Sequence, residues 1–458
     1  MACSVGHPSL LDLPDELIES VVLPLGTDGH SSSRFLAVAR VCRRLHEIVN
    51  PMIYRSVWLR DSTAGDIFAA TIANRPGLIP HVRDVQIHNH RNYEYDDDKK
   101  PPFPCPEDWE ATIAQLFNLE FLAMRSDWFQ SSPSCRRTLP PELRRAQEKW
   151  QDATLSWELG RPTHLQPLPK LKSCNIGYDF MPEKGCNFNT NEPIFHHPGL
   201  QSLSITNLFF QQFGDKELPA KDLTRSTVLE ELILLNCDIS PTGLSQVLLP
   251  PRALKRFTLK GQIPFSEYGY EHTKSRRDYV DALQSHAHSL EFLDLDLYYT
   301  RGESVDLRPF PVLKEFAIGT SELVGDENKR DGRLGDVLPS SLQRLILRDR
   351  LGIFPLAAIR DKVVRGELPH LKHVSCHFSP FEDEDEDDEV SSDEEESDDE
   401  DDIYDPDFPT GKKREKNMAL FANAFKELGV DLSIDHVQDP IRPYQDASCA
   451  CWVYKYRV

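Results

Sequence analysis

The feature that most constrains this chain is a short apolar pattern that returns ten times in order. Each copy reads apolar, two variable residues, apolar, one variable residue, apolar. The copies begin at Val82, Leu119, Leu171, Leu200, Leu229, Leu254, Leu290, Leu313, Leu342 and Leu371. Seven of the nine intervals between these starting points are 23 to 36 residues long. Self-similarity at such a period predicts a chain that repeats one small structural unit.

Each copy predicts a strand, because alternate side chains of a strand point to the same side. The segments between copies contain predicted helices at Asp66–Ala73, Asp108–Phe117, Leu143–Trp157, Arg276–Ala287, Leu356–Val364 and Met418–Leu428. Strands that alternate with helices predict a parallel sheet and place the chain in the α/β class. A doubly wound α/β domain shows the same alternation. The chain lacks that fold's glycine-rich phosphate loop, and its helices are uneven in length.

The repeated pattern resembles the leucine-rich repeat. The copy that begins at Leu229 also has Cys237 at the position where that repeat carries asparagine or cysteine. The resemblance implies a solenoid over residues 61–458, with parallel strands on the concave face and irregular helices on the convex face.

Side chains between the inward-pointing ones are expected on the concave face, where a protein target would bind. Apolar groups near arginine are typical of interface centres. The candidate target-binding residues are Phe121, Arg125, Ile233, Leu235, Phe292, Arg344, Ile346 and Arg348. The alternative is cross-strand packing or ion pairing within the face, with Arg256 and Lys260 beside Asp294 and Asp296.

The segment that precedes the repeats, residues 10–54, has apolar residues at helical spacing. We predict one helix from about Pro14 to Leu25 and a second from about Arg34 to Asn50, ended by Pro51. Two short helices bury too little surface to be comfortably stable alone. Their remaining apolar surface is therefore docked either on the rest of the chain, as a cap of its core, or on another protein.

Three blocks of this segment resemble the F-box: Leu13–Leu17 (LPDEL), Val41–Leu45 (VCRRL) and Pro51–Val57 (PMIYRSV). The family's motif binds the small Skp-type adaptor of a cullin–RING ubiquitin ligase. The resemblance assigns residues 1–60 to a short all-helical, adaptor-binding F-box. The positions that match those used for the adaptor or for the small helical core are Leu13, Pro14, Leu17, Ile18, Leu36, Val41, Cys42, Leu45 and Ile48.

The net charge of −22 is concentrated in one place, because 17 acidic residues fall within Glu382–Asp402. The rest of the chain is close to neutral and lacks the basic face that nucleic-acid binding requires. We predict that residues 381–411 are a disordered insertion within the repeats, because this run repels itself and has little to bury. Pro101–Pro106 and Ser131–Pro141 are predicted insertions, either plain surface loops or segments that contact partners.

The sequence carries no recognisable catalytic motif, such as G-x-S-x-G or H-E-x-x-H. Cys449 and Cys451, and Cys376 beside His377, do not have the ligand spacing of structural zinc. We therefore predict no metal and no cofactor. Scattered cysteines, and the lack of an apolar run long enough to cross a bilayer, predict a soluble cytoplasmic or nuclear protein without membrane contacts.

Together the two patterns resemble the F-box/leucine-rich-repeat proteins of fungal type. The resemblance implies a non-catalytic receptor subunit of a ubiquitin ligase. It would bind a Skp-type adaptor, and through it a cullin, and hold an unknown protein target on the repeats. The alternative is an interaction scaffold that acts outside a ubiquitin ligase. An enzyme would need a catalytic pocket in the proline-rich insertions, and no motif there supports one.

Overall fold

The computed structural model describes much of the chain, which divides into two compact units, Met1–Leu254 and Lys255–Val458. The described residues are 10–26, 31–60, 62–89, 112–113, 115–126, 168–178, 187–189, 193–207, 209–211, 224–260, 275–297, 300, 304–324, 337–349, 354–378 and 411–436. The acidic run, both proline-rich insertions and the expected helix Leu143–Trp157 lie outside them, as does most of the expected helix Asp108–Phe117.

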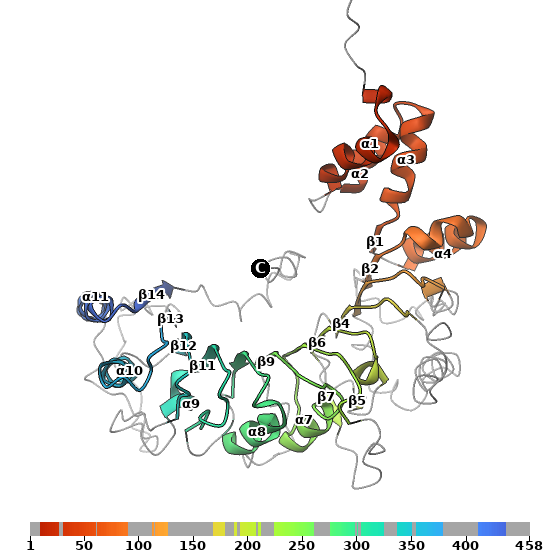
Figure 1. The fold of residues 1–458 in the computed structure, drawn as a ribbon. Coiled ribbons are helices and arrows are strands. Elements are labelled where there is room, and N and C mark those ends of the chain that lie inside the picture. The colour runs from red at the N-terminus through yellow and green to blue at the C-terminus, as the bar shows by residue number, and fades with distance from the viewer. Residues whose placement is uncertain are drawn as a thin grey trace, which may run out of the picture. The chain divides into compact units, whose positions relative to one another are not determined.

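The first unit begins with three helices, α1 (Asp15–Val22), α2 (Ser31–Ala39) and α3 (Arg43–Ile53) (Figure 1). Short 3-10 turns, η1 (Leu10–Asp12) and η2 (Leu23–Gly26), flank α1. We call residues 10–53 the helical module. Its core draws on all three helices and consists of Ile18, Val22, Phe35, Ala39, Leu45, Val49 and Met52. The module therefore closes a small core of its own.

The prediction of one helix from Arg34 to Asn50 is wrong in two respects. Helix α2 ends at Ala39, and Cys42, with φ −158° and ψ 166°, is extended before α3 begins. Helix α3 also continues through Pro51 to Ile53. Pro51 has no N–H to donate to the carbonyl oxygen of Glu47, so the last turn of α3 lacks one helical hydrogen bond.

Parallel strands follow the module in chain order. Among the described residues of the first unit they are β1 (Ser56–Leu59), β2 (Asp84–Asn89), β3 (Phe121–Ser126), β4 (Ser173–Tyr178), β6 (Ser202–Thr206) and β8 (Glu231–Leu235). A separate parallel pair joins β5 (Asn187–Asn189) to β7 (Phe209–Gln211). The remaining helical elements are α4 (Ser62–Asn74), η3 (Pro76–His81), η6 (Pro193–His196) and α7 (Pro241–Val247). Because β1 pairs with β2, the sheet already begins at Ser56, within the segment assigned to the F-box.

The second unit repeats this plan. Its described strands are β9 (Arg256–Lys260), β10 (Phe292–Leu295), β11 (Glu315–Gly319), β12 (Arg344–Asp349), β13 (His373–Phe378) and β14 (Asp431–His436), parallel and in chain order. Its helical elements are α8 (Arg276–Leu283), η8 (Gln284–His286), α9 (Thr320–Val324), α10 (Phe354–Val364) and α11 (Gly411–Glu427). Helices α8, α9 and α10 lie on one side of these strands (Figure 1).

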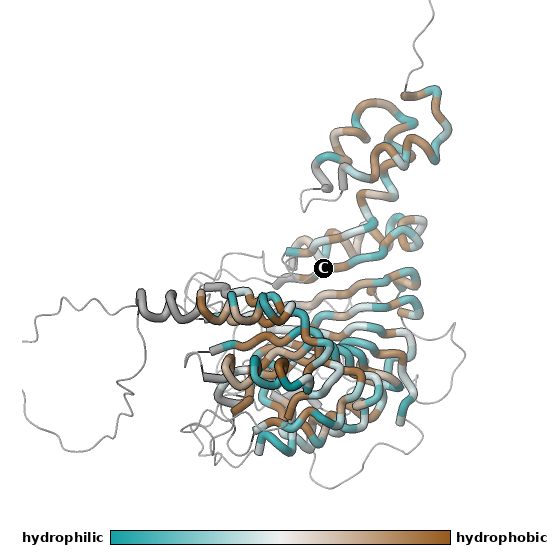
Figure 2. Tube along the Cα trace, turned by 60° about the vertical axis from the view of Figure 1, so that its left-hand side comes forward, coloured by the Kyte–Doolittle hydropathy of each residue, from teal (hydrophilic) through white to brown (hydrophobic). Residues whose placement is uncertain are grey.

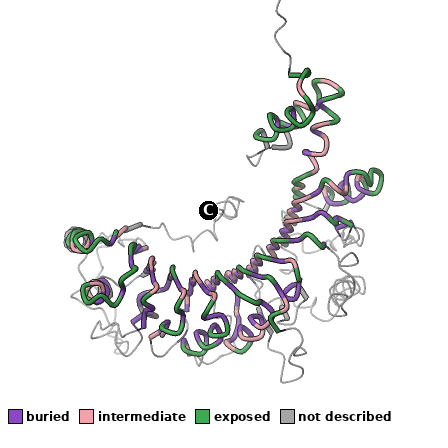
Figure 3. The backbone as a smooth tube through the Cα atoms, viewed as in Figure 1, coloured by how far each residue is buried: buried purple, intermediate pink, exposed green. Residues whose placement is uncertain are grey.

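Every copy of the apolar pattern forms a strand at the same offset. Each strand begins two residues after the first apolar position of its copy. All ten first positions and all ten second positions are buried. The third positions Ile87, Met124 and Ile176 are half-buried, whereas those from Ile205 onward are buried. Buried segments recur along the successive repeats of the chain (Figure 3). An α/β fold with parallel strands and accompanying helices is thus confirmed.

The expected helices that fall on described residues are also found. Asp66–Ala73 lies within α4, and Leu356–Val364 lies within α10. Arg276–Ala287 is α8 followed by η8, and Met418–Leu428 corresponds to the second half of α11. No helix among the described residues has both the length and the apolar character needed to cross a membrane.

His197 is a buried histidine that the fold holds in its neutral form. Its Nε2 lies 3.3 Å from the carbonyl oxygen of Leu168, and the backbone N–H of Gly199 donates to its Nδ1 at 3.1 Å. Because Nδ1 accepts a hydrogen bond, this geometry assigns the proton to Nε2. Burial lowers the pKa of His197 to about 4, although backbone hydrogen bonds act in the opposite direction.

We expect the first unit to lose stability as the pH falls from 6.5 toward about 4. Over this window the unfolded chain protonates His197 while the folded chain does not, so acid favours unfolding. A shift of this size corresponds to about 3 kcal/mol of unfolding free energy at pH 4. Urea unfolding at pH 7 and at pH 4.5 measures this loss of unfolding free energy. The variant His197→Gln should lose less stability on acidification, and identical losses in the two proteins would contradict the assignment.

Candidate interaction surfaces

Exposed apolar side chains are concentrated on the helical module. Seven of the fourteen large apolar side chains that are exposed among the described residues lie between Leu10 and Val41. They are Leu10, Leu11, Leu17, Val21, Leu23, Leu36 and Val41. Hydrophobic residues recur through these helices (Figure 2). A module that has sealed its own core and still exposes this much apolar surface is a candidate for contact with another protein.

Helix α1 carries apolar residues on two of its faces. Ile18 and Val22 are buried, whereas Leu17 and Val21 are 51% and 55% exposed. Residues four apart lie on the same side of a helix, so Leu17 and Val21 form an exposed stripe. Val41, in the turn between α2 and α3, is 70% exposed.

The structure separates the predicted adaptor-binding residues by burial. Pro14, Leu17, Leu36 and Val41 are exposed. Ile18 and Leu45 are buried in the core, and Leu13, Cys42 and Ile48 are intermediate and pack against it. The exposed group can touch a partner without opening the module. The prediction missed Val21, although the successive pairs Leu17–Ile18 and Val21–Val22 indicate two apolar faces.

Arg44 holds the chain that leads into α1. Its Nη2 donates to the carbonyl oxygen of Leu13 at 2.8 Å and lies 2.6 Å from Oδ1 of Asp15. Its Nη1 donates to the carbonyl oxygen of Leu11. One guanidinium of α3 thus fixes the exposed leucines of η1 beside the start of α1. No sequence signal predicted this role, because Arg44 lies about thirty residues from its partners.

We expect Arg44→Met to free the segment Leu10–Leu13 while changing the stability of the module by less than about 1 kcal/mol, since the ion pair is exposed. Hydrogen–deuterium exchange at the amides of residues 10–15 should accelerate. Arg43→Met is the matched control, because the Arg43 side chain is 92% exposed and its ion pair among the described residues is with Glu47, four residues on in the same helix. Equal acceleration in both variants would show that Arg44 is not the tether.

The second unit carries a buried ion cluster on the sheet. Asp294 on β10 is 4% exposed. Its Oδ2 lies 2.9 Å from Nζ of Lys260 on β9, and its Oδ1 lies 2.5 Å from Nη2 of Arg348 on β12. Strand β11 lies between β10 and β12 and places only Ala317 and Gly319 opposite Asp294 and Arg348. These small residues leave room for Arg348 to reach across β11.

The expected pairing with an aspartate is confirmed for Lys260, and Arg256 contacts an aromatic ring. The Cζ of Arg256 lies 4.1 Å from the ring centroid of Phe292. The two residues are aligned partners on β9 and β10, so their side chains are direct cross-strand neighbours. A guanidinium over an aromatic face is a favourable cation–π contact.

The other target-binding candidates differ in exposure. Arg344 is exposed, and Phe121, Ile233, Leu235, Phe292, Ile346 and Arg348 are intermediate. The side chain of Arg125 lies outside the described residues. Phe292 and Arg348 are engaged by neighbours within the sheet, so the alternative of internal packing and ion pairing describes part of this face.

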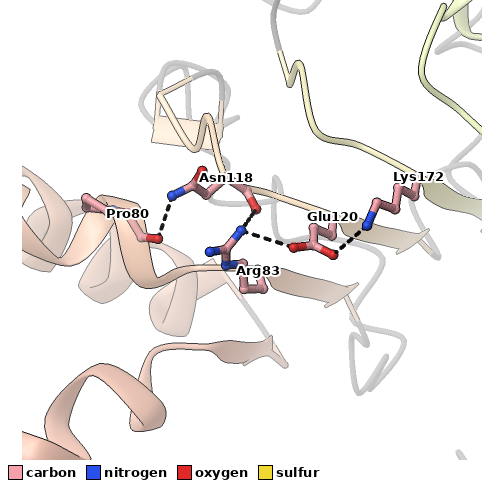
Figure 4. A network of polar contacts seen from close by, with 5 residues as sticks. All are labelled: Pro80, Arg83, Asn118, Glu120 and Lys172. Carbon is pink, nitrogen blue, oxygen red and sulfur yellow. Dashed lines mark hydrogen bonds and ion pairs between the residues drawn. The ribbon is translucent and has the colours of Figure 1, made fainter.

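Charged residues stand directly before the first strands and bind one another. Arg83, Glu120 and Lys172 precede β2, β3 and β4. Glu120 Oε1 lies 3.0 Å from Nη1 of Arg83, and its Oε2 lies 3.2 Å from Nζ of Lys172 (Figure 4). The hydrogen bond from Lys172 and the charges of both cations hold the pKa of Glu120 below its usual range. Nearby, the Asn118 side chain donates to the carbonyl oxygen of Pro80 at 2.8 Å (Figure 4).

The described residues can be examined for side chains that could bind a metal ion. No group of three or more His, Cys, Asp or Glu side chains there could hold a metal ion. Cys376 is a buried free cysteine on β13, and Cys449 and Cys451 lie outside the described residues.

No model of a known protein family matches the chain, and no curated protein matches it significantly.

Proposed function

We propose that this chain is a non-catalytic target-recognition subunit of a cullin–RING ubiquitin ligase. In this proposal the helical module binds a Skp-type adaptor through its exposed apolar side chains. The sheet that follows binds the protein to be ubiquitinated, in the cytoplasm or the nucleus.

The observation that carries the proposal is the exposed apolar surface of a module whose core is already closed. Leu17, Leu36 and Val41 match F-box positions and are all more than 40% exposed. The core of the module is built from its own three helices. This division argues against the alternative in which the helices serve only as a cap, since a cap would direct its spare apolar residues into the chain behind it.

Target binding by the repeats is supported by the side chains that the strands present between their buried positions. In the second unit these include the stacked pair Arg256 and Phe292 and the exposed Arg344. Arginine and aromatic residues are enriched where protein interfaces concentrate their binding energy.

Co-purification of the full chain with a Skp-type adaptor and a cullin tests the proposal. We expect a complex of all three proteins on size-exclusion chromatography. A complex with the adaptor that excludes the cullin would favour an interaction scaffold that acts outside a ubiquitin ligase. The absence of any adaptor complex would refute the proposal.

A further inference from the structure

We infer that the first unit contains a binding site for an oxyanion of the phosphate class, in a cavity between α3 and the first strands of the sheet. The site is separate from the proposed adaptor and target contacts. The inference rests on a cavity, on two arginines that backbone hydrogen bonds hold close together, and on the charge around them.

The cavity has a volume of about 270 Å³ and lies where the helical module meets the first repeats. Its lining comes from α1, from the end of α3, from η3 and from the residues before β1, β2 and β3. The residues that matter for the argument are Glu19, Met52, Arg55, His81, Arg83 and Glu120. At ~30 Å³ per water molecule, this volume equals that of about nine waters. It therefore has room for a phosphate group and a small organic substituent.

Backbone hydrogen bonds place the two arginines of the cavity side by side. The carbonyl oxygen of Arg55 accepts from the N–H groups of Arg83 and Asp84, each at 2.9 Å. Arg55 and Arg83 therefore come from adjacent segments of chain and both line the cavity. A guanidinium presents its donors in a planar fork that matches the oxygens of phosphate.

The charges of the lining residues Arg55, Arg83, Glu19 and Glu120 sum to zero, and Lys172, which binds Glu120 from outside the lining, makes the sum positive. Both oxygens of Glu120 are already engaged, one by Arg83 and the other by Lys172, so these three residues together carry one excess positive charge. Arg55 adds a second positive charge, and Glu19 on α1 removes one. Arg55 and Glu19 make no ion pair with any described residue, and both are exposed.

The test is isothermal titration calorimetry of the full chain with inorganic phosphate, at constant ionic strength adjusted with chloride. We expect saturable binding by the wild type. Arg55→Gln should weaken it about tenfold or more, because a charge-assisted hydrogen bond is lost. Glu19→Gln should strengthen it several-fold, because a like charge is removed. Neither variant breaks an ion pair of the described chain, so both should keep the unfolding temperature of the wild type.

Lys314→Gln is the matched control. Lys314 precedes β11 and pairs with Glu291 at 2.5 Å, which is the same arrangement before a strand, but it belongs to the second unit and does not line the cavity. Phosphate binding by the Lys314→Gln variant should equal that of the wild type. The inference is overturned if the wild type shows no saturable phosphate binding, if Arg55→Gln binds as well as the wild type, or if Lys314→Gln loses as much as Arg55→Gln.

A second titration distinguishes the source of the phosphate. O-phosphoserine should bind more tightly than inorganic phosphate if the cavity takes a phosphorylated side chain, and no more tightly if it takes the free ion. Unphosphorylated serine should give no binding, and binding of serine equal to that of O-phosphoserine would also overturn the inference. Loss of adaptor binding leaves these results unaffected, so the site and the proposed function fail separately.

Discussion

Replacing both Leu17 and Val41 with aspartate is expected to reduce binding of a Skp-type adaptor by more than about a hundredfold. Burial of one large aliphatic side chain contributes roughly 1.5–3 kcal/mol, so the loss of two exceeds the equivalent of two orders of magnitude. The added carboxylates would also have to be desolvated against the partner. Both side chains are more than half exposed, so the module should fold as before. Surface plasmon resonance with immobilised adaptor measures the affinity.

Ile67→Asp provides the matched control for this experiment. Ile67 is an aliphatic residue on α4 that is 62% exposed and lies outside the helical module. Its replacement adds one carboxylate to the same kind of surface, where the double variant adds two, and should leave adaptor binding intact. Adaptor binding that survives in the Leu17→Asp, Val41→Asp variant would show that these side chains are not the contact, and a loss in both proteins would point to a general effect of charge.

Asp294→Ala is expected to destabilise the second unit by about 3 kcal/mol. The substitution leaves Lys260 and Arg348 as two largely buried cations with no carboxylate between them. Replacing the whole cluster, with Lys260→Met, Asp294→Leu and Arg348→Met together, should restore most of the lost stability, because apolar groups then fill the same volume. Urea unfolding, with hydrogen exchange at β10 to assign the transition to this unit, measures both variants.

Asp306→Ala is the control for the loss of an aspartate in the same unit. Asp306 pairs with Arg308 at 2.6 Å, but both side chains are exposed, so the change should cost less than about 1 kcal/mol. If Asp294→Ala costs no more than Asp306→Ala, the cluster on the sheet is not a stabilising element.

The strands could be predicted from the sequence because a local pattern specifies them. The spacing of Leu200, Leu203 and Ile205 already contains the turn into the strand and its two inward side chains, and the same holds for every copy. The break between α2 and α3 could not be predicted in the same way. Val38, Cys42, Leu45 and Val49 continue at helical spacing through the break, because the two helices place their apolar faces against one core.

The candidate sites depend on contacts between residues far apart in the chain, and this limited their prediction. Arg348 reaches Asp294 across 54 residues of sequence, over a strand that places the small residues Ala317 and Gly319 opposite them. The role of Arg44 likewise depends on carbonyl oxygens of the preceding segment, which carry no signature in their side chains. The exposed apolar stripe on α1 could be predicted from the spacing of its apolar residues, whereas these polar contacts could not.

Within each unit the described strands of the long parallel sheet follow one another in chain order, and this has a consequence for how such a protein can change. The two longest intervals between copies, 37 and 52 residues, precede β3 and β4, yet the register of those strands is the same as elsewhere. Lengthening such a connection raises the entropy of loop closure by only about 0.6 kcal/mol for each doubling. New segments can therefore be gained between strands during evolution while every existing pairing is preserved.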